Sequence, residues 1–533
     1  MIDTPRTWRC EVRKRMQFKA YESPELPALA WCARVDRGKD EITLVHGSGV
    51  ETRPHAFVEG AWDGDFTSLD FMDATIVCGT GGRAEDSQVR FSASTDRVCP
   101  LFSIARGDSV FVSQSPTFVM TMSGEAPDDL YPFYGHDFLS IGRQGLYCQS
   151  GKLRTRSGRS LRVHFGTIVT IDTGLRITFS PHRLCEVPRD FKSYKSLLLE
   201  GVRLVLQNAG DSARRKRYTP LAAISKGYDS NATAALASLA GCEEAVSFRD
   251  SRSDDPQEDS GVDNARDLGM SCAEYDRWAY LDLKSPDAEF AYFTTSTNVP
   301  LAAAEPLLGG RVLIVGQSGD AVWNSKIASL CTNMSRPFAK FPGVGQLEFR
   351  LRVGYQLLPV AVIAARHNRA IHDISVSEEM RPWVIGGDYD RPIPRRIAEE
   401  TGLPRERFAT RKLGTGHAHF TKASGFSTQA LNDYLRFVNE KRAAAPWLAL
   451  YWRMRARWRT LLFKVVSKQR LVESSPLQRR FPFILNARPL SGTDDFMFAF
   501  QWASARMRSR YIPANGVAGI LSGDRKDAHV ACA

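Results

Sequence analysis

The residues between 221 and 236 combine an apolar run with a polar turn whose groups could bind phosphate. The apolar run 221–224 predicts a buried strand, and the alanine-rich run 231–236 predicts the start of a helix. Where a strand turns tightly into a helix, the first helical N–H groups lack partners and converge on one point, where the helix dipole also favours negative charge. The stretch therefore predicts an anion site.

The side chains of this turn suit a nucleotide that carries magnesium. Ser225 and Ser230 can donate from their hydroxyls, and Gly227 lets the backbone approach an anion closely. Asp229 supplies the hard oxygen ligand that magnesium prefers. The stretch contains no Walker string. The alternative is a structural turn in which Asp229 only caps the following helix.

A second apolar run ends in a similar turn. Residues 311–315 predict another buried strand, and Gly316, Gly319 and Asp320 follow it. In a parallel sheet with helices on both faces, ligands bind at the carboxyl ends of the strands. We therefore expect Asp229 and Asp320 to lie at one site.

A third segment completes a pattern. Glu379 begins a stretch with Arg381 and Pro382, and a Gly-Leu-Pro turn at 402–404 precedes Arg411 and Lys412. The three stretches, in this order, resemble the asparagine synthetase family and its β-lactam synthetase relatives. The first of them is similar to the Ser-Gly-Gly-x-Asp-Ser loop of the N-type ATP pyrophosphatases, also called the PP-loop.

The resemblance implies ATP and Mg²⁺ as cofactors, with Asp229 and Asp320 as the magnesium ligands. It implies that Lys412, assisted by Arg411, stabilises the charge that grows as an amine attacks. Tyr355 and Glu379 are further candidates for orienting or deprotonating that amine. The nucleotide-binding residues that it implies are Ser225, Lys226, Gly227, Asp229, Ser230, Gly316 and Gly319.

The chain departs from the family pattern at three positions. Lys226 replaces a loop glycine, and Gln317 and Ala321 replace two glutamates. The lost carboxylates remove negative charge near the metal, and the new ammonium could contact a phosphate. Two interpretations stay open: a divergent synthetase with altered metal handling, or a nucleotide-binding scaffold or regulator that has lost catalysis.

The implied reaction is the adenylation of a substrate carboxylate, with release of AMP and pyrophosphate, followed by acyl transfer to an amine. Glutaminases of this family attack with a cysteine that is the first residue of the chain, whose own amino group acts as the base. Here the first cysteine is Cys10, and Met1 and Ile2 begin the chain. We therefore expect no glutamine hydrolysis, so the amine must come from the substrate itself or from a second molecule.

The length of 533 residues suits two large domains. Short apolar runs between Gly, Asp and Ser turns predict a β-rich domain over 1–187, which resembles a degenerate glutaminase of the Ntn type. Strand and helix alternate over 188–533, which predicts an α/β domain: a parallel sheet with helices on both faces, similar to the adenine-nucleotide α-hydrolases. This second domain ends in a basic, aromatic helical region.

Several classes of protein are disfavoured. No apolar run reaches the roughly twenty residues that a membrane span needs, and the start of the chain lacks the layout of a secretion signal. The ten cysteines include no Cys-x-x-Cys pair, which disfavours a zinc site and fits a cytoplasmic protein. The acidic residues between 254 and 259 predict a solvated loop, and His417 and His419 lack a third ligand nearby. The oligomeric state, a homo-oligomer included, stays open.

The net charge of +12 is concentrated in one block. Residues 441–480 hold eleven Lys and Arg residues against one acid, Glu473, and Trp447, Trp452 and Trp458 are interleaved with the arginines. Such a block could bind single-stranded nucleic acid or an anionic membrane, and RNA base modification is an alternative function. We favour an amphipathic helix whose aromatic residues pack on the domain, with nucleic acid not a partner.

Overall fold

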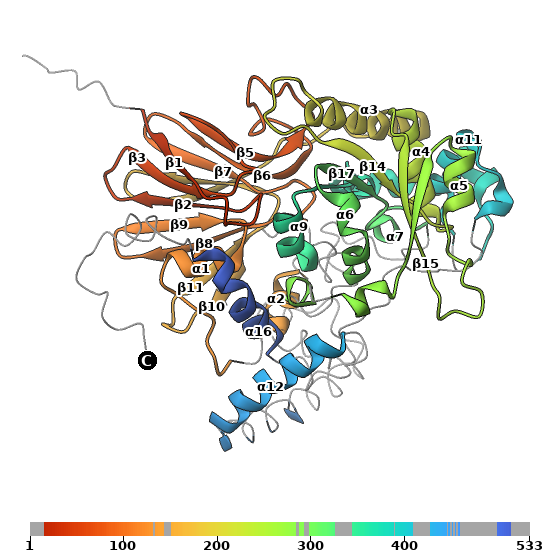
Figure 1. Ribbon diagram of the computed structural model, residues 1–533. Coiled ribbons are helices and arrows are strands. Elements are labelled where there is room, and N and C mark those ends of the chain that lie inside the picture. The colour runs from red at the N-terminus through yellow and green to blue at the C-terminus, as the bar shows by residue number, and fades with distance from the viewer. Residues whose placement is uncertain are drawn as a thin grey trace, which may run out of the picture.

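The computed structural model describes residues 15–131, 134–142, 151–283, 287–292, 298–325, 344–387, 390–408, 427–444 and 498–512, together with positions 446, 447, 450, 454, 457 and 458. These residues form a mixed α/β protein. An N-terminal, mostly antiparallel β region precedes a parallel sheet flanked by helices (Figure 1). This coarse fold is the one that the sequence predicts.

The N-terminal region consists of two sheets. The seven-stranded sheet has the order β1 (Gln17–Glu22), β3 (Glu41–His46), β2 (Trp31–Asp36), β9 (Ser109–Ser113), β8 (Leu101–Arg106), β11 (Ser160–His164) and β10 (Gly151–Arg154). The six-stranded sheet has the order β13 (Ile177–Pro181), β12 (Thr167–Asp172), β7 (Gln88–Ser92), β6 (Val77–Ala84), β5 (Ala56–Trp62) and β4 (Glu51–Arg53). Among the pairs in these two sheets, only β1 with β3 is parallel.

Large aromatic side chains fill the space between the two sheets. The ring of Trp31 lies 4.7 Å from that of Phe57 and 5.9 Å from that of Phe91, measured between centroids. The period of two along a strand directs Trp31 and Ala33 of β2 into this core and Cys32 into the core on the other face. The alternation that the sequence shows in these runs therefore places both faces of the seven-stranded sheet in contact with apolar residues.

The second region is built on a five-stranded parallel sheet. Its order is β16 (Ser271–Asp276), β15 (Glu244–Arg249), β14 (Thr219–Ala223), β17 (Arg311–Val315) and β18 (Gln356–Pro359). The chain enters at the central strand β14, adds strands on one side and then returns to β17 on the other side. The order thus reverses between β14 and β17, and ligands in such sheets bind at this point of reversal.

Helices cover both faces of the parallel sheet, as predicted. On one face Ala222, Ile314 and Leu358 lie in a core with α3 (Phe191–Ala209), α4 (Tyr228–Leu239) and α11 (Pro392–Glu400). On the other face their neighbours Leu221, Leu313 and Leu357 lie in a different core, which includes residues of α9 (Leu347–Val353). The sheet is therefore apolar on both sides, as its unbroken apolar runs require.

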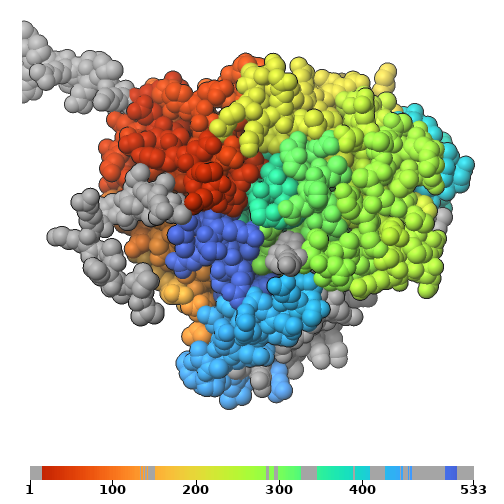
Figure 2. Space-filling model, viewed as in Figure 1, coloured from red at the N-terminus to blue at the C-terminus, as the bar shows by residue number. Residues whose placement is uncertain are grey.

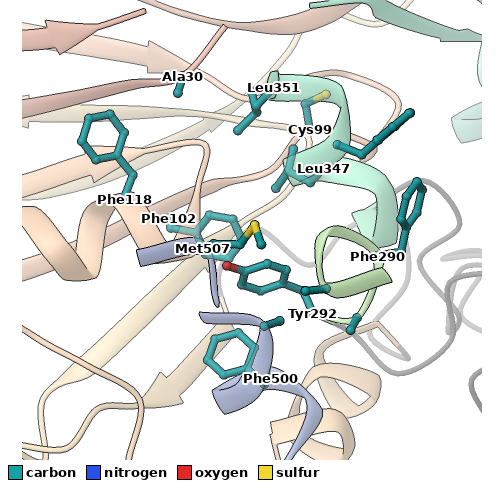
Figure 3. Packing of buried hydrophobic residues seen from close by; sticks show 14 of the residues in the cluster. Ala30, Cys99, Phe102, Phe118, Phe290, Tyr292, Leu347, Leu351, Phe500 and Met507 are labelled. Carbon is teal, nitrogen blue, oxygen red and sulfur yellow. The ribbon is translucent and has the colours of Figure 1, made fainter. Parts of the chain in front are cut away.

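The second of these cores also joins the two regions. Figure 3 shows Phe102 and Phe118 of the N-terminal region close to Leu347 of α9 and to Phe500 and Met507 of α16 (Ala499–Met507). In Figure 2 the dark-blue residues of α16 and η12 (Arg508–Tyr511) lie between the red and orange N-terminal strands and the light-blue α12 (Thr428–Ala444). The end of the described chain thus contributes to the core between the regions.

Candidate functional site

The predicted strand, turn and helix around residue 225 are all present. β14 ends at Ala223, and α4 begins at Tyr228 with Gly227 as its N-cap. No side chain caps this helix end. The dipole of α4 therefore favours a negative charge at this end of the helix.

The turn is held by its own hydroxyl groups. Ser225 Oγ lies 2.8 Å from Ser230 Oγ and accepts a hydrogen bond of 3.1 Å from the N–H of Gly227. Ser230 Oγ donates to the carbonyl oxygen of Gly227 at 2.9 Å. The ammonium of Lys226 donates to the carbonyl oxygen of Gln257 at 3.0 Å. The two serines, predicted to bind phosphate, therefore also define the shape of the loop.

The glycine turn after β17 lies directly against this loop. A Cβ atom added to Gly316 would lie 2.5 Å from the backbone carbonyl of Asp229, and one added to Gly319 would lie 2.5 Å from the Cγ atom of Asp229. Any side chain at either position would collide with the loop, so both glycines are required by the close approach. β14 and β17 are parallel neighbours, which brings together two turns that are far apart in the sequence.

Asp320 follows Gly319 in the short helix α7 (Gly319–Val322) and is exposed. The next residue, Ala321, is 7% exposed and lies in the core shared with α4. A glutamate at this position would carry its charge into that core. Ala321, which replaces the glutamate of the family pattern, therefore packs among apolar residues on the inner side of α7.

Arg391 is a member of the site that the sequence reasoning missed. Its guanidinium forms an ion pair with the carboxylate of Asp229, and the two side chains are 6% and 16% exposed. Arg391 precedes Pro392 and is the N-cap of α11, which packs on α4. Pro392 predicts the start of a helix at this point, but no local signal places Arg391 beside Asp229, because the contact depends on how α11 packs on α4.

Asp259 is also placed differently from the prediction. Asp254 and Asp255 are exposed, as expected of a solvated loop, but Asp259 is 4% exposed and its carboxylate lies 3.4 Å from Arg277. Burial raises the pKa of Asp259 to about 6, against the opposing effects of Arg277 and of hydrogen bonds from Ser225 and the Lys226 backbone. The solvated-loop prediction is therefore wrong for this one residue, which lies against the phosphate loop.

Two predicted catalytic residues lie away from this edge. Tyr355 directly precedes β18, at the amino end of the sheet, and is fully buried with its ring 6.0 Å from that of Phe349. Burial raises the pKa of its phenol far above the ordinary range. We correct the assignment of Tyr355, because it cannot contact a substrate held at the opposite edge of the sheet.

Glu379 has a structural partner instead of a place at the loop. It lies in η8 (Glu378–Trp383), accepts a hydrogen bond of 3.0 Å from the N–H of Phe191 and pairs with Arg396 at 3.1 Å. Phe191 is the first residue of α3, so Glu379 caps that helix. This contact replaces the predicted role of Glu379 in orienting the amine.

Several predicted residues lie outside the described part of the chain. These are Arg411, Lys412, His417, His419 and Cys10. Six cysteines are described, and burial raises the pKa of every one of their thiols. None of these six thiols is therefore prepared to act as a nucleophile, since the thiolate is the reactive form.

The basic and aromatic block is described only in part. Trp447 and Trp458 are 71% and 60% exposed, and Leu450 and Met454 between them are exposed as well. The expectation that the aromatic residues pack on the domain is wrong for these two tryptophans. They leave a row of apolar side chains on the surface at helical spacing.

The residues at the sheet edge fit magnesium and a polyphosphate. Among the described residues no group of three or more His, Cys, Asp and Glu side chains could enclose a metal ion. Magnesium does not need one, because it is commonly bound by one or two carboxylates together with phosphate oxygens and water. Asp229 and Asp320 suit that mode, and the absence of side chains at Gly316 and Gly319 lets the second turn approach Asp229 closely.

Comparisons with known proteins do not place the chain in a family. No protein-family model matches the chain, and no curated protein matches it. Among the helices of the described residues, none combines the length and apolar character that a bilayer crossing requires.

Proposed function

We propose that the protein is an ATP-dependent synthetase that forms an amide bond. One observation carries the proposal: the turns that follow β14 and β17 meet where the strand order reverses, and Gly316 and Gly319 lie against Asp229. A helix N-terminus, two hydroxyls and a carboxylate at such a point suit the phosphates of a nucleotide with its metal. The resemblance to asparagine synthetases supplies the reaction class.

In this proposal the loop residues hold the pyrophosphate part of ATP. The first N–H groups of α4 and the hydroxyls of Ser225 and Ser230 donate to its oxygens, and Asp229 and Asp320 are the magnesium ligands. Magnesium, when bound, offsets the negative charge on the pyrophosphate leaving group. The loop therefore orients the α-phosphate for attack by the substrate carboxylate.

The amine comes from the substrate or from a second molecule. This follows from the sequence, in which the first cysteine is Cys10 and no cysteine begins the chain. Lys412 and Arg411 keep their proposed role of stabilising the charge that develops when the amine attacks. The carboxylate substrate is a small molecule or a peptide.

The proposal is tested by pyrophosphate release from purified protein with ATP and magnesium, against a panel of carboxylic acids with and without amines. We expect release that depends on one acid and is lost in Asp229→Ala. The matched control is Asp254→Ala, because Asp254 is an exposed carboxylate. Undiminished release by Asp229→Ala would show that the site is misassigned.

A second function is favoured by a specific contact. The pair between Arg391 and Asp229 already neutralises the proposed metal ligand, and Ala321 lacks the carboxylate of the family pattern. A nucleotide-binding protein without catalysis would show both features. Binding of ATP with no pyrophosphate release for any acid or amine in the panel would favour this second function.

A further inference from the structure

We propose that Arg391 exchanges partners when the site is filled: it leaves the carboxylate of Asp229 and donates to the phosphates of the nucleotide. This inference rests on the proposed nucleotide site and names a further binding residue in it. Without ligand, Arg391 and Asp229 compensate each other's charge. With ligand, the carboxylate takes the divalent cation and the guanidinium takes the anion.

The backbone of Arg391 is held rigidly beside the loop. The preceding residue, Asp390, accepts a hydrogen bond of 2.9 Å from the N–H of Gly386, and its carbonyl oxygen accepts one of 3.1 Å from Ser325. Pro392 follows and begins α11, which packs on α4. The exchange therefore needs only a change in the side chain of Arg391 and no movement of its helix.

The carboxylate of Asp229 is enclosed on two sides. Arg391 contacts its Oδ2 atom, and Gly319 approaches so closely that an added Cβ atom would lie 2.8 Å from Oδ1. Asp229 is 16% exposed at its side chain, so solvent and a cation can still reach it. The metal ligand and its internal counter-ion thus occupy the same narrow space.

The chemistry of both groups suits two alternative partners. A guanidinium binds a carboxylate or a phosphate with similar geometry, because its fork of donors matches both anions. A partly buried carboxylate needs a positive partner at all times, since leaving it alone is costly. Arg391 is that positive partner in the ligand-free protein. Once a divalent cation pairs with Asp229 in its place, the guanidinium of Arg391 can bind phosphate.

The departures from the family pattern support this role. Gln317 and Ala321 stand where the family has carboxylates, which weakens the attraction of the site for metal ions. A guanidinium supplies positive charge to the phosphates and, unlike a metal ion, needs no carboxylate ligands to hold it in the site. Arg391 therefore compensates for the weaker metal binding that these two residues imply.

The exchange is tested by two binding measurements on the full chain, without turnover. Mn²⁺ alone is titrated by electron paramagnetic resonance, and inorganic pyrophosphate with Mg²⁺ is titrated by calorimetry. In Arg391→Met we expect Mn²⁺ to bind about tenfold more tightly and pyrophosphate about tenfold more weakly, the size of one charge-assisted hydrogen bond. Arg391→Lys keeps the charge and should restore part of both values.

The control variant is Arg405→Met, which removes another guanidinium near α11. Arg405 pairs with Glu399 at 2.9 Å and is 56% exposed. It should change neither affinity. Thermal unfolding of each variant shows that it is folded before binding is compared.

The outcomes separate the exchange from the proposed site. Opposite changes in the two affinities of Arg391→Met support the exchange. Weaker binding of both probes would mean that Arg391 only positions Asp229, and unchanged pyrophosphate binding would mean that it never reaches the phosphates. Either result overturns the inference while the site stands. If the unaltered protein binds neither probe, the proposed site itself is wrong.

Discussion

Two arginine–carboxylate pairs in this molecule have the same chemistry and opposite surroundings. At the contact between the two regions, Arg350 of α9 forms two hydrogen bonds with Glu59 of β5, at 2.9 and 3.0 Å, and both side chains are fully buried. At the edge of the parallel sheet, Arg391 is also buried, but the side chain of its partner Asp229 is 16% exposed. The first pair is fully enclosed, whereas the carboxylate of the second reaches the surface.

The partners of each pair explain the difference. Glu59 also accepts a hydrogen bond of 2.7 Å from Thr80, which in turn accepts one of 2.8 Å from the indole of Trp31. Arg350 also donates to the side chain of Gln356 at 3.2 Å. This buried network joins the two regions, although the Nε atom of Arg350 has no hydrogen-bond partner among the described residues. The edge pair lies beside a helix end that no side chain caps, so its charges are still available to a ligand.

The largest expected effect comes from breaking the enclosed pair. Arg350→Met leaves Glu59 charged and buried, which should lower the free energy of unfolding by about 3–5 kcal/mol. Urea unfolding followed by tryptophan fluorescence measures the change. As a control, Arg37→Met removes an exposed pair with Asp108 and should cost less than about 1 kcal/mol. Equal effects of the two variants would contradict the contrast drawn between buried and exposed pairs.

A buried acid at the same contact should make stability depend on pH. Glu348 is 2% exposed and accepts hydrogen bonds from Ser115, at 2.6 Å, and from Tyr511. Burial raises its pKa from 4.5 to about 7, against the opposing effect of these hydroxyls. The folded state therefore holds the proton more tightly than the unfolded state, so stability falls as the pH rises from about 4.5 to 7.

The contribution of Glu348 to this fall is about 3 kcal/mol. Glu348→Gln should remove it, because the amide stays neutral: its oxygen can accept one of the two hydrogen bonds, and its NH2 group can donate to the other hydroxyl. Unfolding in urea at several pH values measures the difference between the two proteins. The inference about Glu348 fails if the free energy of unfolding changes by the same amount in both proteins between pH 4.5 and 7.

At the sheet edge, a side chain added beside Asp229 should weaken both folding and metal binding. The methyl group of Gly319→Ala would lie 2.5 Å from the Cγ atom of Asp229 and must displace its carboxylate. We expect a loss of about 1–3 kcal/mol in stability, as for other overpacked sites, and about tenfold weaker binding of Mn²⁺. Gly387→Ala is the control, because no atom lies within 4 Å of its added Cβ. Unchanged Mn²⁺ binding in Gly319→Ala would separate Asp229 from the metal.

The smallest effect is expected from Lys226. Its ammonium donates to the carbonyl oxygen of Gln257, and no ion pair joins it to an acid within the described part of the chain. Lys226→Ala should weaken pyrophosphate binding by less than about fivefold, as expected of an exposed charge. A loss of a hundredfold or more would show that Lys226, like Arg391, changes partner when the ligand binds. Calorimetry with inorganic pyrophosphate distinguishes these results.

The parts of the site that could be predicted are local in the sequence. The loop from Ser225 to Ser230 and the turn from Gly316 to Asp320 each follow an apolar run, and the parallel arrangement of such runs predicts that the turns meet. Arg391 could not be predicted in the same way, because its contact with Asp229 depends on how α11 packs on α4 across 162 residues of chain. Asp259 was misjudged because its burial depends on Arg277, which lies just past the end of another strand.

The sequence by itself determined the two regions, the strands and turns of the parallel sheet, and the loop from Ser225 to Ser230. These follow from apolar periodicity, glycine positions and helix starts, which are properties of neighbouring residues. Only the tertiary structure decided which charges lie beside the loop and which are enclosed. It pairs Asp229 with Arg391 and Glu59 with Arg350, and it places Tyr355 at the opposite edge of the sheet. The reason is physical: the burial and pairing of a charge depend on every element that packs around it, and the sequence does not show which elements those are.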